Sequence, residues 1–147
     1  MVVHNTARGA RKLTALVALV GASATTGCFV ADLLGSDDVI AGDYELVSVN
    51  EQDIPAVVSE VQYLGGSLTM REGGSFSQVL LLQLGEIGVT TVIDGGYTLD
   101  GSTVLFVIAS ITVNGEQQTS ETGSINGTWD GDEIRIADEQ IRLVFRK

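Results

Sequence analysis

Hydrophobic and polar residues alternate in short runs along most of the chain after residue 42, and glycine, asparagine or aspartate interrupts these runs at short intervals. Alternation with a period of two places apolar side chains on one face of an extended strand. No segment in this part of the sequence has the 3.6-residue period of an amphipathic helix. The expected strands cover 43–49, 54–56, 67–71, 75–84, 89–99 with a kink at Gly95 and Gly96, 103–113, 117–129, 133–137 and 141–146. Residues 57–63 fit either a strand or an irregular segment.

Tight turns connect most of these strands. Asp100-Gly101, Asn114-Gly115 and Asp130-Gly131 are dipeptides that favour short β-hairpins. Consecutive hairpins produce an up-and-down meander, and about eight strands bury their apolar faces best by closing into a barrel, which leaves no free edge. We therefore predict an all-β fold, an up-and-down antiparallel β-barrel. A two-sheet sandwich is the alternative, but it usually needs long crossover connections that this sequence lacks.

Several motifs in the strand region have the order and spacing of a known type of domain. They are GDYELVSVN at 42–50, IPA at 54–56, GSLTM at 66–70 followed by GSF at 74–76, GGYTLDG at 95–101, GTWDGD at 127–132 and LVFRK at 143–147. Residues 42–147 therefore resemble the small lipocalin-like domains of bacterial envelope lipoproteins. The resemblance implies a lipocalin-like barrel and a lipid-anchored location in the cell envelope. It implies no particular activity, because such domains typically have none assigned.

The N-terminal segment has the organisation of a secretory signal. Three basic residues and no acidic residue lie within the first 12 positions, an apolar run covers 13–20, and small residues cover 21–27. The apolar run is too short for a transmembrane helix, which needs about 20 such residues. The four residues 25–28 resemble a bacterial lipobox, in which Cys28 would be acylated and become the first residue of the mature chain. Ordinary signal cleavage after 22–24, which leaves Cys28 as a free thiol, is the alternative.

This interpretation divides the chain into a lipoprotein signal peptide (1–27), the lipidated Cys28 with a tether (28–42), and the lipocalin-like barrel domain (43–147). Two or three acyl chains hold a protein stably on a membrane. Phe29 follows the cysteine where enteric lipoproteins retained in the inner membrane commonly have aspartate, and this points to the outer membrane. The membrane is thus the first expected partner, through acylated Cys28.

Composition excludes several functions. The chain has 147 residues, 44% of them hydrophobic, and a net charge of -11. After residue 27 there are five cationic and 19 acidic residues, which gives a net charge of -14. Nucleic acid is therefore not an expected partner, because its binding depends on lysine and arginine.

The residue types that catalyse most reactions are almost absent. The one histidine lies in the predicted signal, and the one cysteine is not free if it is acylated, so a nucleophile–histidine pair cannot form. A zinc site is not expected for the same reason. The acidic clusters at 37–38 and 130–133 lack the spacing of a calcium loop and are interpreted as turn and surface residues. We expect no enzyme, no cofactor and no metal.

Strand parity predicts which side chains face the barrel interior. The candidate set for binding a small apolar ligand in the lumen is Tyr44, Leu46, Phe76, Tyr97, Leu99 and Trp129. The alternative is that these side chains form a filled core, which a small domain needs in order to fold. A void of several hundred Å³ lined by Tyr44, Tyr97 and Trp129 would favour ligand binding.

Two apolar runs, 79–82 and 104–109, break the alternation. In a barrel of one layer, half of these residues must point outward, and parity selects Val79, Leu81, Leu105 and Val107. Outward apolar residues indicate a partner protein, which would contact Leu81 and Val107, or a covering segment such as the tether or residues 54–63.

The function expected from the sequence is therefore a lipid-anchored envelope lipoprotein that binds a small apolar ligand or a partner. The alternative is a structural or interaction lipoprotein with a solid barrel.

Overall fold

The computed structural model describes residues 39–118 and 123–147. The predicted signal peptide, Cys28 and nearly all of the predicted tether lie outside the described residues. Every regular element within the described ranges is a β-strand. These ranges contain no helix that is long and apolar enough to cross a membrane.

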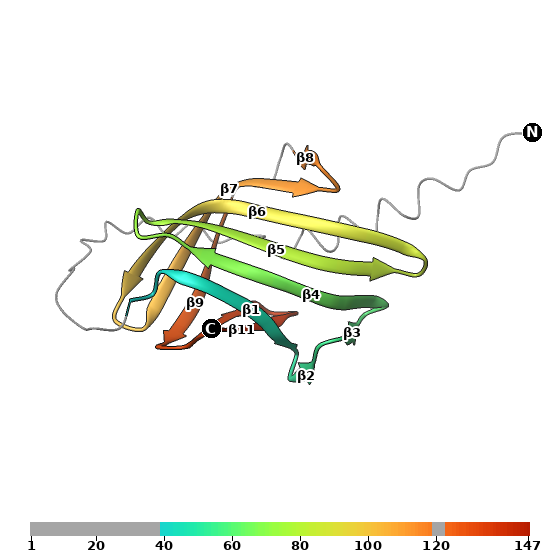
Figure 1. Cartoon of the computed structure of the whole chain (residues 1–147), viewed down its shortest axis with the longest axis horizontal. Helices are drawn as coiled ribbons and strands as arrows, with labels where there is room; N and C mark the ends of the chain where they lie inside the picture. The colour runs from blue at the N-terminus through green and yellow to red at the C-terminus, as the bar shows by residue number, and fades with distance from the viewer. Residues whose placement is uncertain (1–38, 119–122) are drawn as a thin grey trace, which may run out of the picture.

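The strands form a closed antiparallel barrel (Figure 1). Eight strands make the ring in the order β1-β4-β5-β6-β7-β9-β10-β11, and it closes because β1 pairs with both β4 and β11. Apart from the short strands β2, β3 and β8, ring neighbours are consecutive in the chain, so the predicted all-β up-and-down barrel is confirmed. The strands are β1 (Gly42–Val49), β2 (Gln52–Asp53), β3 (Ala56–Val58), β4 (Val61–Met70), β5 (Ser75–Leu84), β6 (Ile87–Asp100), β7 (Thr103–Val113), β8 (Glu116–Gln118), β9 (Gly123–Asp130), β10 (Glu133–Ala137) and β11 (Arg142–Arg146).

Three predicted strands differ clearly in the structure. The strand expected at 54–56 is wrong, because residues 54 and 55 form a bend and the strand there, β3, begins at Ala56. β4 begins at Val61 rather than at residue 67, so Gly65 and Gly66 lie inside a strand. A Cβ on Gly66 would lie 2.5 Å from the Val79 carbonyl oxygen, so glycine is needed there for close approach and does not mark a turn. The strand expected at 117–129 is two strands, β8 and β9, which both pair with β7.

The interior of the barrel is packed with apolar side chains. Inward positions alternate along much of the barrel, as parity predicts; on β7, for example, Val104, Phe106 and Ile108 are buried whereas Val107 is exposed. Three shifts of register, on β1, on β4 and between β6 and β7, insert an extra residue and change which positions point inward. This core continues from one end of the barrel to the other and stabilises the domain through burial of apolar surface.

The predicted outward orientation of Leu81 and Val107 is confirmed, with 44% and 49% of these residues exposed. The two do not form one surface. Leu81 pairs with Thr90 of β6 and Val107 pairs with Gly96 of the same strand, six residues further along, or about 20 Å. Asp94 lies between these two positions.

Candidate functional site

A small cavity lies inside the barrel and has a volume of about 60 Å³. Its lining is mostly apolar and comes from seven strands and the β10–β11 turn. The lining residues are Tyr63, Phe76, Gln78, Leu80, Thr91, Ile93, Phe106, Ile108, Ile111, Ile125, Ile136, Ile141 and Leu143. An engineered cavity that binds benzene measures about 150 Å³, and pockets for drug-sized ligands measure about 300–1,000 Å³. The interior therefore has room for a few water-sized groups and is otherwise filled.

One wall of the cavity carries three polar side chains from neighbouring strands: Tyr63 on β4, Gln78 on β5 and Thr91 on β6. All three residues are at least nine-tenths buried. The Thr91 hydroxyl has no hydrogen-bond partner in the part of the chain that the structure describes. Gln78 and Tyr63 line the same cavity beside it. A buried hydroxyl without a partner, with two polar neighbours next to it, can bind water or a ligand at little cost.

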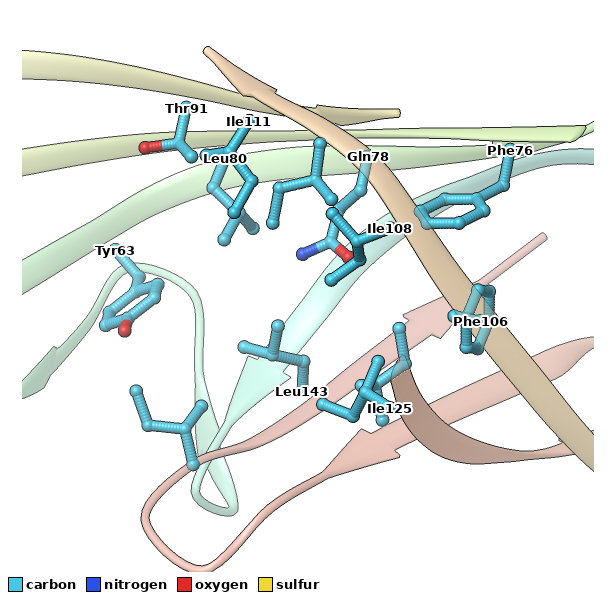
Figure 2. Close-up of a pocket in the computed structure, with 13 residues that line it drawn as sticks. Tyr63, Phe76, Gln78, Leu80, Thr91, Phe106, Ile108, Ile111, Ile125 and Leu143 are labelled. Carbon is cyan, nitrogen blue, oxygen red and sulfur yellow. The ribbon is translucent and has the colours of Figure 1, made fainter. Parts of the chain in front are cut away.

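The facing wall of the cavity is apolar. Figure 2 shows the amide of Gln78 reaching toward the middle of the space, with Ile125 and Leu143 below it and Phe106 to one side. The rings of Phe76 and Phe106 meet edge to face, with their centroids 5.0 Å apart and their planes at 79°, and close the cavity on that side. The cavity thus has one hydrogen-bonding wall and one apolar wall.

The structure divides the six predicted lumen residues into two groups. Phe76 lines the cavity; Tyr44, Leu46, Tyr97, Leu99 and Trp129 do not. Tyr44 and Leu46 are buried in the core, whereas Tyr97, Leu99 and Trp129 are half-buried and pack against it.

The three polar aromatics of the predicted set instead close one end of the barrel. Each donates a hydrogen bond to a backbone carbonyl there: the Tyr44 hydroxyl to Ile40 at 2.8 Å, the Tyr97 hydroxyl to Arg71 at 2.6 Å, and the indole Nε1 of Trp129 to Gly131 at 2.8 Å. The Lys147 ammonium lies 5.1 Å from the centroid of the Tyr44 ring. This end is held shut by hydrogen bonds and ring contacts, so the cavity belongs to the middle of the barrel and its opposite end.

The side chains that line the cavity are uncharged at physiological pH. Burial raises the pKa of the Tyr63 hydroxyl to about 12, and the negative charge of Asp138 contributes in the same direction. Burial likewise raises the pKa values of Tyr44 and Tyr97. Because its polar lining groups are two hydroxyls and one carboxamide, the cavity suits a neutral guest. An ionised guest would lose its hydration without gaining a counter-charge.

The outer surface carries the second feature of interest, which we call the apolar outer patch: Val57, Leu64, Val79, Leu81 and Val92. It lies across β3, β4, β5 and β6, which are neighbours in the sheet. Val57, Leu64 and Leu81 are exposed, and Val79 and Val92 are half-buried and paired with each other. Exposed apolar side chains that gather on one surface are typical of interaction sites.

Charged residues gather elsewhere on the barrel. Glu133 lies between two arginines, with its Oε1 2.5 Å from Arg135 and its Oε2 2.7 Å from Arg146. The hydrogen bond from Arg146 lowers the pKa of this carboxyl. Arg142 pairs with Glu51 at 2.8 Å. No three metal-ligating side chains gather in residues 39–118 and 123–147.

Sequence reasoning missed the polar wall of the cavity, although a signal for two of its members is present. Gln78 occupies an inward position between Phe76 and Leu80, and Thr91 stands between the inward residues Val89 and Ile93. A polar residue at a position whose neighbours on the same face are apolar and inward indicates a polar group inside the barrel. Tyr63 had no comparable signal, because it lies in the segment whose structure the pattern left open.

No protein-family model, no curated protein and no solved structure matches this chain. Its architecture, eight antiparallel strands in up-and-down order around one interior, is compatible with a lipocalin-like fold.

Proposed function

We propose that the chain is a lipid-anchored lipoprotein of the cell envelope, held in the outer membrane through acylated Cys28, whose barrel acts as an interaction module. A partner would dock on its outer surface, and the barrel would serve as a rigid scaffold without catalytic activity. The observation that carries this proposal is the combination of a nearly filled interior with apolar side chains exposed outside, Leu81 and Val107 among them. A carrier of a lipocalin type needs the opposite arrangement, a large interior void.

The cavity supports a second candidate function, the binding of a small neutral molecule. Tyr63, Gln78 and Thr91 provide polar groups opposite an apolar wall, and the Thr91 hydroxyl has no hydrogen-bond partner among the described residues. Polar groups of this kind fix the orientation of a ligand in a pocket. The volume of about 60 Å³ limits such a guest to a few non-hydrogen atoms unless the lining side chains move.

Native mass spectrometry of the protein, purified without exposure to denaturant, separates the two functions. The interaction module should have the mass of the processed chain, with no small molecule attached. A stoichiometric adduct that is lost in the Gln78→Leu variant would overturn the first proposal in favour of the second. The Gln83→Leu variant is the matched control, since Gln83 lies on the same strand and does not line the cavity.

A further inference from the structure

We propose that the apolar outer patch is the interface between two copies of this chain, arranged as a symmetric dimer. The inference rests on the proposed function as an interaction module and names its partner. A symmetric interface brings the same surface of both copies together, so that surface must complement itself. An uncharged apolar surface meets this requirement, whereas a surface of one charge does not.

The residues of the patch are continuous across the sheet. Val79 pairs with Val92, and Leu81 of the same strand pairs with Gly65, which follows Leu64. Val57 pairs with Gln62, two positions before Leu64. The side chains between and beside them, those of Gln62, Gln83 and Thr90, are neutral.

The strands that form this side of the barrel are almost without charge. β4, β5 and β7 contain no charged residue, and β6 contains only Asp94 and Asp100. The chain as a whole is strongly acidic, with a net charge of -11. Two copies that meet across β3–β6 keep most of their acidic residues apart, because like charges do not face each other there. Depletion of charged residues is also characteristic of the cores of homodimer interfaces.

A lipid surface fits the patch less well. Side chains that rest on a bilayer usually include tryptophan or tyrosine at the headgroup level and lysine or arginine beside them. β3, β4, β5 and β6 contain no tryptophan, lysine or arginine. Of their two tyrosines, Tyr63 lines the cavity and Tyr97 closes one end of the barrel. Val107 is not part of the interface, because Asp94 separates it from Val92 along the barrel.

Cysteine cross-linking of the full chain in bacterial cells tests the proposal. Thr90→Cys places a thiol beside Leu81, and Thr98→Cys places one at an exposed position of the same strand, outside the patch. The unmodified chain reports any cross-linking through Cys28 itself. With a short thiol-reactive cross-linker, Thr90→Cys should yield a species of twice the chain mass, and Thr98→Cys should not exceed the unmodified chain.

The dimer should be lost when Leu81→Lys or Leu81→Gln is added to Thr90→Cys, and it should persist with Val107→Lys. Its yield should rise with ionic strength, because salt screens the repulsion between acidic copies and leaves apolar contact intact. Protease resistance of each variant reports whether the barrel is folded. If Leu81→Lys prevents folding, Leu81→Gln provides the test instead.

Three results would overturn the dimer. One is equal cross-linking of Thr90→Cys and Thr98→Cys, and another is a dimer that survives both Leu81 substitutions. The third is a Thr90→Cys product whose mass is not twice that of the chain and which Leu81→Lys abolishes; it would leave the interaction module standing with a different partner. If Thr90→Cys forms no product at all and Val107→Cys forms none either, the interaction module fails together with the dimer.

Discussion

The buried hydroxyl of Thr91 lacks a hydrogen-bond partner among the described residues, and a group in this situation costs about 1–3 kcal/mol of stability. Valine has nearly the shape of threonine without the hydroxyl, so Thr91→Val should raise the free energy of unfolding by about 1 kcal/mol. Urea denaturation measures the change, and Thr98→Val, at an exposed position of the same strand, should alter stability by less than about 0.5 kcal/mol. A loss of stability in Thr91→Val would mean that water or a ligand satisfies the hydroxyl.

The Tyr63 hydroxyl gives the barrel a sensitivity to alkaline pH. Its pKa is raised from 10.0 to about 12, so between these values the folded protein holds a proton that the unfolded chain has released. The contribution of Tyr63 to the free energy of unfolding is therefore complete below pH 10. It is lost as pH rises toward 12, at up to about 1.4 kcal/mol per pH unit. Urea denaturation at about pH 9 and about pH 11 should show a smaller decline for Tyr63→Phe than for the unmodified chain. The decline should not vanish, because the pKa values of Tyr44 and Tyr97 are also raised. Equal declines in the two proteins would contradict the assignment to Tyr63.

At the scale of the strand, Gly95 allows β7 to cross closely over β6. A Cβ at Gly95 would lie 2.0 Å from the Val107 carbonyl oxygen and 3.0 Å from the Phe76 ring, at the point where the register between the two strands shifts. Gly95→Ala should therefore destabilise the barrel by about 1–3 kcal/mol, since the backbone has to move. Gly88 of the same strand has no atom within 4 Å of an added Cβ, so Gly88→Ala should be neutral or slightly stabilising. Thermal melts of the two alanine variants make the comparison, and similar melting temperatures would contradict it.

The strands were predictable because period-two alternation and hairpin dipeptides are local signals. The bulges were not, since an extra residue near Tyr63 or Asp94 is fixed by how neighbouring strands cross. Gly65 and Gly66 show the difficulty: the expected strand begins only after them, at residue 67, but in the structure the pair lies within β4 where β5 comes close. The same limit applies to the interior. Parity placed Tyr44, Tyr97 and Trp129 inward, yet only their place along the barrel decides that they close its end.

At the scale of the whole molecule, the distribution of charge separates two sides of the barrel. Arg135, Arg142 and Arg146 and their carboxylate partners lie on or beside β10 and β11, whereas β4 and β5 carry no charge. The ring of eight strands has no free edge, and the strands that pair on one side only, β2, β3 and β8, are two or three residues long, so recognition must rely mainly on the faces or the ends of the barrel. One end is closed by the three aromatics, and this leaves the uncharged side as the surface best suited to contact.

The proposed location of the molecule in the membrane rests on acylation of Cys28, which lies outside the described residues. Each acyl methylene buried in a bilayer contributes about 0.8 kcal/mol, and the mature chain, with its excess of acidic residues, has little other attraction to an anionic membrane. Cys28→Ser should therefore release the processed protein into the soluble fraction or leave an uncut precursor in the membrane. Membrane fractionation with mass determination distinguishes these forms, and Ser23→Ala, a change that leaves the lipobox intact, serves as the control.

A Cys28→Ser chain that has lost its signal and still sediments with membranes would show that something other than an acyl group holds it there. The next step would then be to add Leu81→Lys to Cys28→Ser and repeat the fractionation, because this removes the apolar contact from a chain that already lacks the acyl anchor.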